Sequence, residues 1–73
     1  MSRVVAIGEA ARLEGLVLAG VIIKVASEPQ AVREAWDGLG DDVGLAVLTS
    51  TASEALDESQ RARRTGLTVV MPA

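Results

Sequence analysis

The chain contains no cysteine and no histidine among its 73 residues. Disulfide bridges, thiol nucleophiles, imidazole bases and the commonest zinc sites are therefore excluded by the residue inventory alone. Any chemistry would depend on carboxylates, hydroxyls, arginines and a single lysine, Lys24. This composition indicates a cytosolic domain that holds no metal ion and uses neither thiol nor imidazole chemistry.

Aromatic residues are almost absent as well, since Trp36 is the single one in the sequence. Hydrophobic residues nevertheless make up 49% of the chain, so the core is built from valine, leucine, isoleucine and alanine. A chain of this length buries only about 60% of the surface that its unfolded form exposes. We therefore expect one small domain, residues 1–73, of marginal stability.

Long hydrophobic runs and an excess of positive charge are also missing. Ten acidic and seven basic residues give a formal charge of −3, which does not attract a phosphate backbone and argues against a nucleic-acid partner. The longest apolar run, Leu16–Ile23, is far shorter than the roughly 20 residues of a membrane-spanning helix. The N-terminus leads directly into a strand pattern without a signal-peptide cleavage site, so we expect no direct membrane insertion.

Short β-branched runs alternate with helical patterns along the whole sequence. This alternation, with short connections, predicts a small doubly wound α/β fold of the Rossmann-like or flavodoxin-like kind, in which four parallel strands take the order 2-1-3-4 with helices on both faces. The predicted strands are Val4–Ile7, Val21–Val25, Val43–Leu48 and Leu67–Met71, and the predicted helices are Glu9–Val17, Pro29–Leu39 and Ala52–Arg64.

The second helix has the clearest pattern, because Val32, Ala35, Trp36 and Leu39 recur at helical spacing and Ser27 precedes it as a possible cap. Trp36 is therefore predicted to lie in the core. The first helix is expected to bury its apolar stripe of Ala10, Leu13 and Val17. The third helix has little to bury, and a capping box of Thr49–Thr51 with Glu54 is expected to begin it.

Ligands of doubly wound folds bind beyond the carboxyl ends of the strands, so a ligand-binding motif would stand at these positions. A dinucleotide fingerprint would need Gly-x-Gly-x-x-Gly after the first strand, but residues 8–13 offer only Gly8 followed by the carboxylate of Glu9. No phosphate-binding loop of the Gly-x-x-x-x-Gly-Lys type occurs. A response-regulator receiver would need an acidic pair where Glu9 stands alone and an aspartate where Thr49 stands. We therefore predict no catalytic, cofactor-binding or metal-ligating residues, and no enzyme activity.

Two polar clusters leave a ligand-binding alternative open. The hydroxyl-rich loop Thr49–Ser53 either binds an anion or simply caps the third helix. Asp41 and Asp42 either hold a cation or form a solvated turn, and the turn is favoured because they precede a strand. If the loop bound an anion, the chain would be a small flavodoxin-like regulatory or ligand-binding domain without catalytic activity.

Several segments, in order and spacing, resemble the F subunit of the V/A-type rotary ATPases. They are the first strand Val5–Gly8, the glycine-containing turn Gly15–Val21, the helix Pro29–Leu39, the strand Asp42–Thr49 after an acidic lead, and the final strand Thr68–Pro72. The sequence departs from the family pattern at Glu9, Leu16 and Val17. The family's C-terminal tail and helix have no counterpart in residues 1–73.

The resemblance implies a non-catalytic component of the central stalk, without cofactors, that couples ATP hydrolysis or synthesis to proton or sodium transport. It implies a coiled-coil partner, the D subunit, and a cytoplasmic location peripheral to the membrane through the ATPase complex. The apolar turn is the candidate contact with that partner, unless its side chains fill the core instead. The candidate contact residues are Gly15, Leu16, Leu18, Gly20 and Val21.

Overall fold

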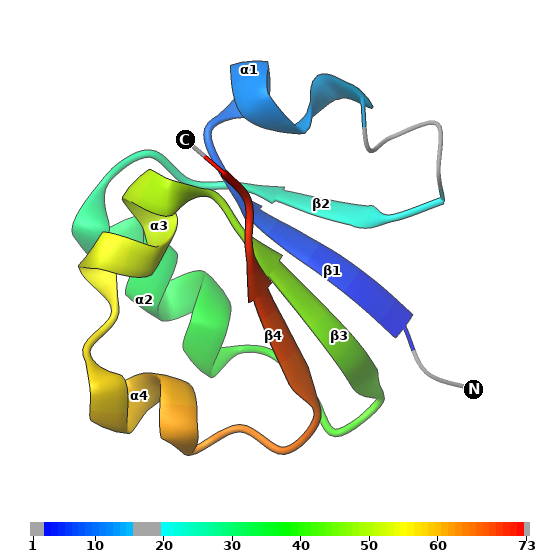
Figure 1. The fold of residues 1–73 in the computed structure, drawn as a ribbon, viewed down its shortest axis with the longest axis vertical. Helices are drawn as coiled ribbons and strands as arrows, with labels where there is room; N and C mark the ends of the chain where they lie inside the picture. Colours follow the sequence, from blue (N-terminus) through cyan, green and yellow to red (C-terminus); the bar gives the residue numbers. More distant parts are fainter. Residues whose placement is uncertain (1–2, 16–19, 73) are drawn as a thin grey trace.

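Four parallel strands form one sheet in the spatial order β2-β1-β3-β4 in the computed structural model, which describes residues 3–15 and 20–72 (Figure 1). The predicted strand order and parallel pairing are confirmed. The elements in chain order are β1 (Arg3–Gly8), α1 (Ala10–Leu13), β2 (Ile22–Val25), α2 (Pro29–Asp37), β3 (Val43–Leu48), α3 (Ser50–Ala55), α4 (Glu58–Ala62) and β4 (Leu67–Val70).

The strand register sorts the apolar side chains into two faces, because residues paired across parallel strands point to the same side of the sheet. One face, here called the helix face, carries Val5 and Ile7 of β1 opposite Ala46 and Leu48 of β3. The other, here called the open face, carries the alternate residues of all four strands. These are Val4, Ala6, Ile23, Val25, Leu45, Val47, Leu67 and Val69.

The hydrophobic core lies on the helix face. Strands β1 and β3 pack there against α2 and α3, which contribute Val32, Trp36 and Ala52, together with Leu56 at the end of α3. Trp36 is only 5% exposed, as predicted, and its indole N–H donates a hydrogen bond of 2.9 Å to the backbone oxygen of Gln60. The one large aromatic side chain therefore joins α2 to α4 beneath the sheet.

Coverage of the two faces is unequal. Figure 1 shows α2, α3 and α4 together on one side of the sheet and α1 apart from them, near the end of β1. Helix α1 contacts β1 and has four residues, of which Leu13 is buried at 1% exposure. Helices thus lie on both faces, as predicted, but the second face carries only one helical turn among the described residues.

The predicted third helix, Ala52–Arg64, is wrong as a continuous element. Leu56 leaves the helical region with φ −105° and ψ 134°, which divides the segment into α3 and α4. The break lets Leu56 reach the core, where it is 4% exposed. Asp57 then begins α4 with a capping box, since it accepts from the Gln60 N–H while the Gln60 side chain accepts from the Asp57 N–H.

The other two helices differ from expectation at their ends. Glu28, not Ser27, precedes the first turn of α2, without a side-chain cap, and Pro29 occupies that turn. Helix α1 ends at Leu13, and a short 3₁₀ turn continues it to Gly15. Val17, expected in the apolar stripe of this helix, lies outside the described residues.

Candidate interaction surface

The carboxyl ends of β1 and β3 are joined by a hydrogen bond between Glu9 and Thr49. The Thr49 hydroxyl donates to Glu9 Oε1 at 2.6 Å and accepts from the Ala52 N–H at 3.2 Å. Thr49 is 2% exposed and is the N-cap of α3. Of the two predicted roles for the Thr49–Ser53 loop, the structure therefore supports capping, although Glu54 takes no part in a capping box here.

The charge at this position is negative. The Thr49 hydroxyl, a backbone hydrogen bond and the nearby Arg12 hold the pKa of the Glu9 carboxyl below its usual value. A carboxylate thus stands at the start of α3, where a bound phosphate would have to lie. The chain's own carboxylate occupies the position that other doubly wound proteins use for an anionic ligand.

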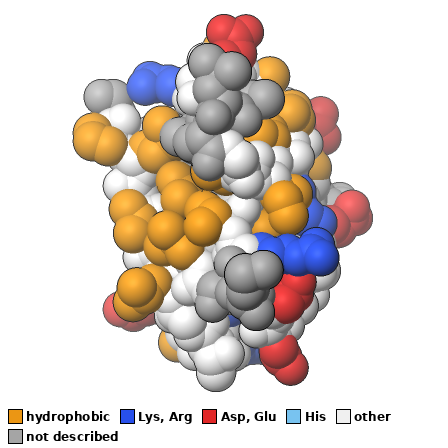
Figure 2. Space-filling model, turned by 90° about the vertical axis from the view of Figure 1, so that its right-hand side faces the viewer, with side chains coloured by type: hydrophobic (Ala, Val, Ile, Leu, Met, Phe, Trp, Pro, Cys, Tyr) orange, Lys and Arg blue, Asp and Glu red, His pale blue; other side chains and the backbone are white. Residues whose placement is uncertain are grey.

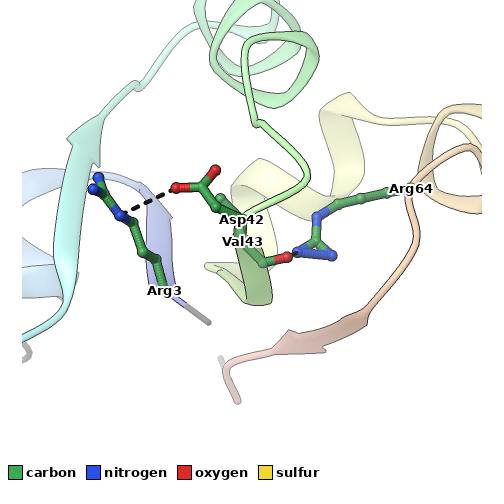
Figure 3. Close-up of polar contacts among 4 residues, drawn as sticks. All are labelled: Arg3, Asp42, Val43 and Arg64. Atoms are coloured by element: carbon green, nitrogen blue, oxygen red, sulfur yellow. Dashed lines mark hydrogen bonds and ion pairs between the residues drawn. The ribbon is translucent and has the colours of Figure 1, made fainter. Parts of the chain in front are cut away.

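The amino-terminal edge of the sheet holds a second group of charged side chains (Figure 3). Arg3 Nε lies 3.1 Å from Asp42 Oδ2, and both side chains are more than half exposed, so the ion pair contributes little to stability. Arg64 donates hydrogen bonds to the backbone oxygens of Val43 and Thr65 and lies 5.9 Å from the centre of the Trp36 ring. Arg64 therefore ties the loop before β4 to β3.

Neither hollow at this edge resembles a ligand site. One, of about 260 Å³, lies between α2 and the loop before β4. Its lining contains both acidic and basic side chains, namely Asp37, Asp41, Arg63 and Arg64. The second, of about 250 Å³, lies beside the Arg3–Asp42 pair. Both fall below the roughly 300–1,000 Å³ typical of ligand pockets. In the part of the chain that the structure describes, no three acidic residues come together as a metal site.

The predicted contact turn, Gly15–Val21, is described only at its ends. Gly15 is exposed and a Cβ there would meet no atom within 4 Å, while Gly20 is exposed with φ +75°, a conformation that favours glycine. Val21 is partly buried. Leu16 and Leu18 lie outside the described residues, so the use of this turn as a contact stays a prediction.

The most distinctive surface is the open face of the sheet, which sequence reasoning missed. Val25 is 63% exposed, Leu67 71% and Val69 50%, and the partly buried Leu45 and Val47 lie on the same face. Figure 2 shows hydrophobic side chains gathered on this side of the molecule. Leu67 and Val69 lie beside Leu45 and Val47 in the β3–β4 register and form an apolar patch, and apolar patches mark interaction sites in soluble proteins. Nothing in the sequence indicated it, because the apolar stripe of Ala10, Leu13 and Val17 predicted a longer first helix on this face than the four residues of α1.

These features define a small doubly wound α/β domain whose β1 and β3 carboxyl ends are joined by the Glu9–Thr49 pair and whose open face exposes Val25, Leu67 and Val69. Among solved structures, the chain is similar to the crystal structure of the F subunit of the V-type ATP synthase from Archaeoglobus fulgidus, with a TM-score of 0.81 and 18% sequence identity. The match covers 97% of this chain and 98% of that chain. The chain thus has the fold of this rotary-ATPase component, as the resemblance predicted.

Comparisons with family models and with curated protein sequences give no match. Within residues 3–15 and 20–72, none of the helices has the length and apolar character needed to cross a bilayer.

Proposed function

We propose that this chain is a non-catalytic component of the central stalk of a V/A-type ATPase, where it couples ATP hydrolysis or synthesis to proton or sodium transport through protein contacts. The observation that carries the proposal is the fold shared with the F subunit of the V-type ATP synthase over nearly the whole length of both chains. The exposed Leu67 and Val69 on the open face support it, because a protein that acts by binding needs apolar surface beyond what its own core uses.

The partner in this proposal is a coiled coil, the equivalent of the D subunit. Neighbouring strands lie about 4.8 Å apart and a helix with its side chains is about 10 Å wide, so one helix covers two strands. Strands β3 and β4 supply Leu45, Val47, Leu67 and Val69 to the open face, and α1 contacts β1 instead. One helix of a coiled coil fits this half of the face. The turn with Gly15, Leu16, Leu18, Gly20 and Val21 remains a second proposed contact.

In such an assembly the chain would be held near the membrane through its partners, on the cytoplasmic side. The Glu9–Thr49 hydrogen bond favours this role over the flavodoxin-like ligand-binding alternative, because that alternative needs the start of α3 to be free for an anion.

Co-expression with the D subunit of a V/A-type ATPase from the same organism, followed by size-exclusion chromatography, tests the proposal. We expect a one-to-one complex. Val69→Asp should weaken it at least tenfold, because a charge would be buried against the partner. The matched control is Val70→Asp, since Val70 has similar exposure, 42%, but points to the helix face. Absence of a complex with the unsubstituted chain would refute the stalk role, whereas equal effects of the two variants would refute only the surface.

A further inference from the structure

The outer edge of β4 has free backbone hydrogen-bonding groups. Among the described residues, β4 pairs with β3 alone and ends the sheet. The Met71 N–H donates to the Leu48 oxygen at 2.7 Å, so Met71 directs its backbone groups toward β3. Because the backbone groups of successive strand residues point to opposite edges, Leu67 and Val69 also direct their N–H and C=O groups toward β3. The N–H and C=O groups of Thr68 and Val70 therefore point outward, away from the sheet.

Apart from its short length of four residues, this edge lacks the features by which proteins usually prevent strand pairing. Natural edge strands are protected by charged side chains, prolines within the strand or bulges. Residues 66–73 contain no charged residue, and the β3–β4 register is continuous, whereas the opposite edge strand β2 carries Lys24. Side chains on both sides of β4 are exposed, at 71% for Leu67, 50% for Val69 and 42% for Val70.

We propose that β4 pairs antiparallel with β4 of a second copy of this chain, with Val69 on the two-fold axis. Thr68 would then exchange both of its hydrogen bonds with the partner's Val70, and Val70 with the partner's Thr68, which gives four bonds and an eight-stranded sheet. Val69 and the partner's Val69 form the pair between these bonds, with Cα atoms about 4.5 Å apart. This arrangement satisfies every outward group of the strand without placing like charges together.

A second copy is the occupant favoured by the edge itself, because the pattern of outward groups is complementary to its own two-fold image. Pairing of four residues buries well below the roughly 1,200 Å² of a stable interface, so the association is weak, with half-saturation at roughly hundreds of micromolar. It does not cover the open face of either copy, so it is independent of the stalk role and does not rest on it.

Disulfide trapping tests the geometry, because the chain has no cysteine of its own. A Val69→Cys chain places two thiols across the two-fold axis at a Cα separation within the disulfide range of about 4.4–6.8 Å. We expect its disulfide-linked dimer to form at least tenfold faster than that of Val25→Cys, the matched control at an exposed valine on the same face but the opposite edge strand. Equal rates would overturn the proposal.

Amide hydrogen exchange tests the unsubstituted chain. Between about 50 μM and about 1 mM protein, exchange should slow at Thr68 and Val70 and stay unchanged at Leu67 and Val69, which pair within the copy. Thr68→Pro removes an outward N–H group that makes no hydrogen bond to β3. The substituted chain should be monomeric by sedimentation at about 1 mM and should keep the circular dichroism spectrum of the parent. A dimer that persists in Thr68→Pro but is lost in Val47→Lys would indicate that the open faces stack on one another, which would overturn the proposal. An unsubstituted chain that stays monomeric and shows amide exchange independent of concentration would overturn it as well.

Discussion

A methyl group at position 8 would collide with Thr49. A Cβ built on Gly8 lies 2.3 Å from Thr49 Cγ2 and 2.4 Å from its Oγ1, and Thr49 is held in place by Glu9 and Ala52. Gly8→Ala should therefore lower the free energy of unfolding by about 1–3 kcal/mol in chemical denaturation. Gly15→Ala is the control, because a Cβ there meets nothing within 4 Å. Equal stability of the two variants would contradict the close approach of β1 to the start of α3.

Trp36 contributes both volume and a hydrogen bond to the core. Trp36→Ala should cost about 3–5 kcal/mol, enough to unfold a domain of this size. Trp36→Phe keeps a ring on the helix face but leaves the Gln60 oxygen without its indole donor, so we expect a smaller loss of about 1–3 kcal/mol. Thermal unfolding followed by circular dichroism separates the two variants. A Trp36→Ala chain as stable as the parent would contradict the buried position of the indole.

The Glu9 carboxyl makes stability depend on pH. Its pKa is lowered in the folded chain, chiefly by the Thr49 hydroxyl, so its contribution is present above the unfolded value of about 4.5 and is lost as the pH falls through the lowered folded value. The pKa of Asp57 is also lowered, mainly because its carboxylate accepts from the Gln60 N–H. The stability that Asp57 contributes is therefore lost at low pH as well. Glu9→Gln should thus flatten, without abolishing, the fall in unfolding free energy below pH 4.5. Denaturation at a series of pH values measures the slope, and an unchanged slope would contradict the Glu9–Thr49 bond.

At the scale of whole elements, the strands were more predictable than the helices. Apolar, largely β-branched runs such as Val4–Ile7, separated by helical segments, leave few right-handed arrangements, so pattern alone gave the sheet order. The division at Leu56 was missed, because an apolar residue within a polar segment gives no sign that it turns toward the core. Asp57 and Gln60 did carry the spacing of a capping box. The Glu9–Thr49 pair joins residues 40 positions apart, which periodicity cannot detect.

The Asp57 side chain supplies the N-cap of α4. Asp57 Oδ1 accepts from the Gln60 N–H at 2.7 Å and from the Ser59 hydroxyl at 2.9 Å. Asp57→Ala should speed amide exchange at Gln60 and Arg61, while α3, which is capped by Thr49, keeps its protection. Asp57→Asn keeps an acceptor and should retain most of the protection. Loss of protection in α3 as well would show that the two helices behave as one unit.

At the scale of the molecule, the open face follows from how the connections cover the sheet. Right-handed crossovers place α1 on one side and α2, α3 and α4 on the other, since the chain steps from β1 to β2 in one direction and then back past β1 to β3 and β4. Among the described residues, the helix on this face is the four-residue α1, which contacts β1 and does not reach across to β4. Side chains on β4 are therefore bare although the sequence pattern is that of a buried strand, and this could not be predicted until the length of α1 was known.

The closed carboxyl edge predicts that the folded chain does not bind nucleotide. A phosphate at the start of α3 would have to displace the Glu9 carboxylate, which the Thr49 hydroxyl holds in its charged form by lowering its pKa. Titration of Mg-ATP to about 1 mM should therefore leave the amide resonances of Ser50, Thr51 and Ala52 in place and produce no saturable heat. The Glu9→Gln variant should be titrated beside the parent, because this substitution removes the negative charge but keeps a hydrogen-bond acceptor for the Thr49 hydroxyl. Saturable shifts at these three amides in the parent chain at micromolar nucleotide would contradict the closed edge and favour a ligand-binding domain, whereas shifts confined to Glu9→Gln would show that this one carboxylate is what keeps phosphate out.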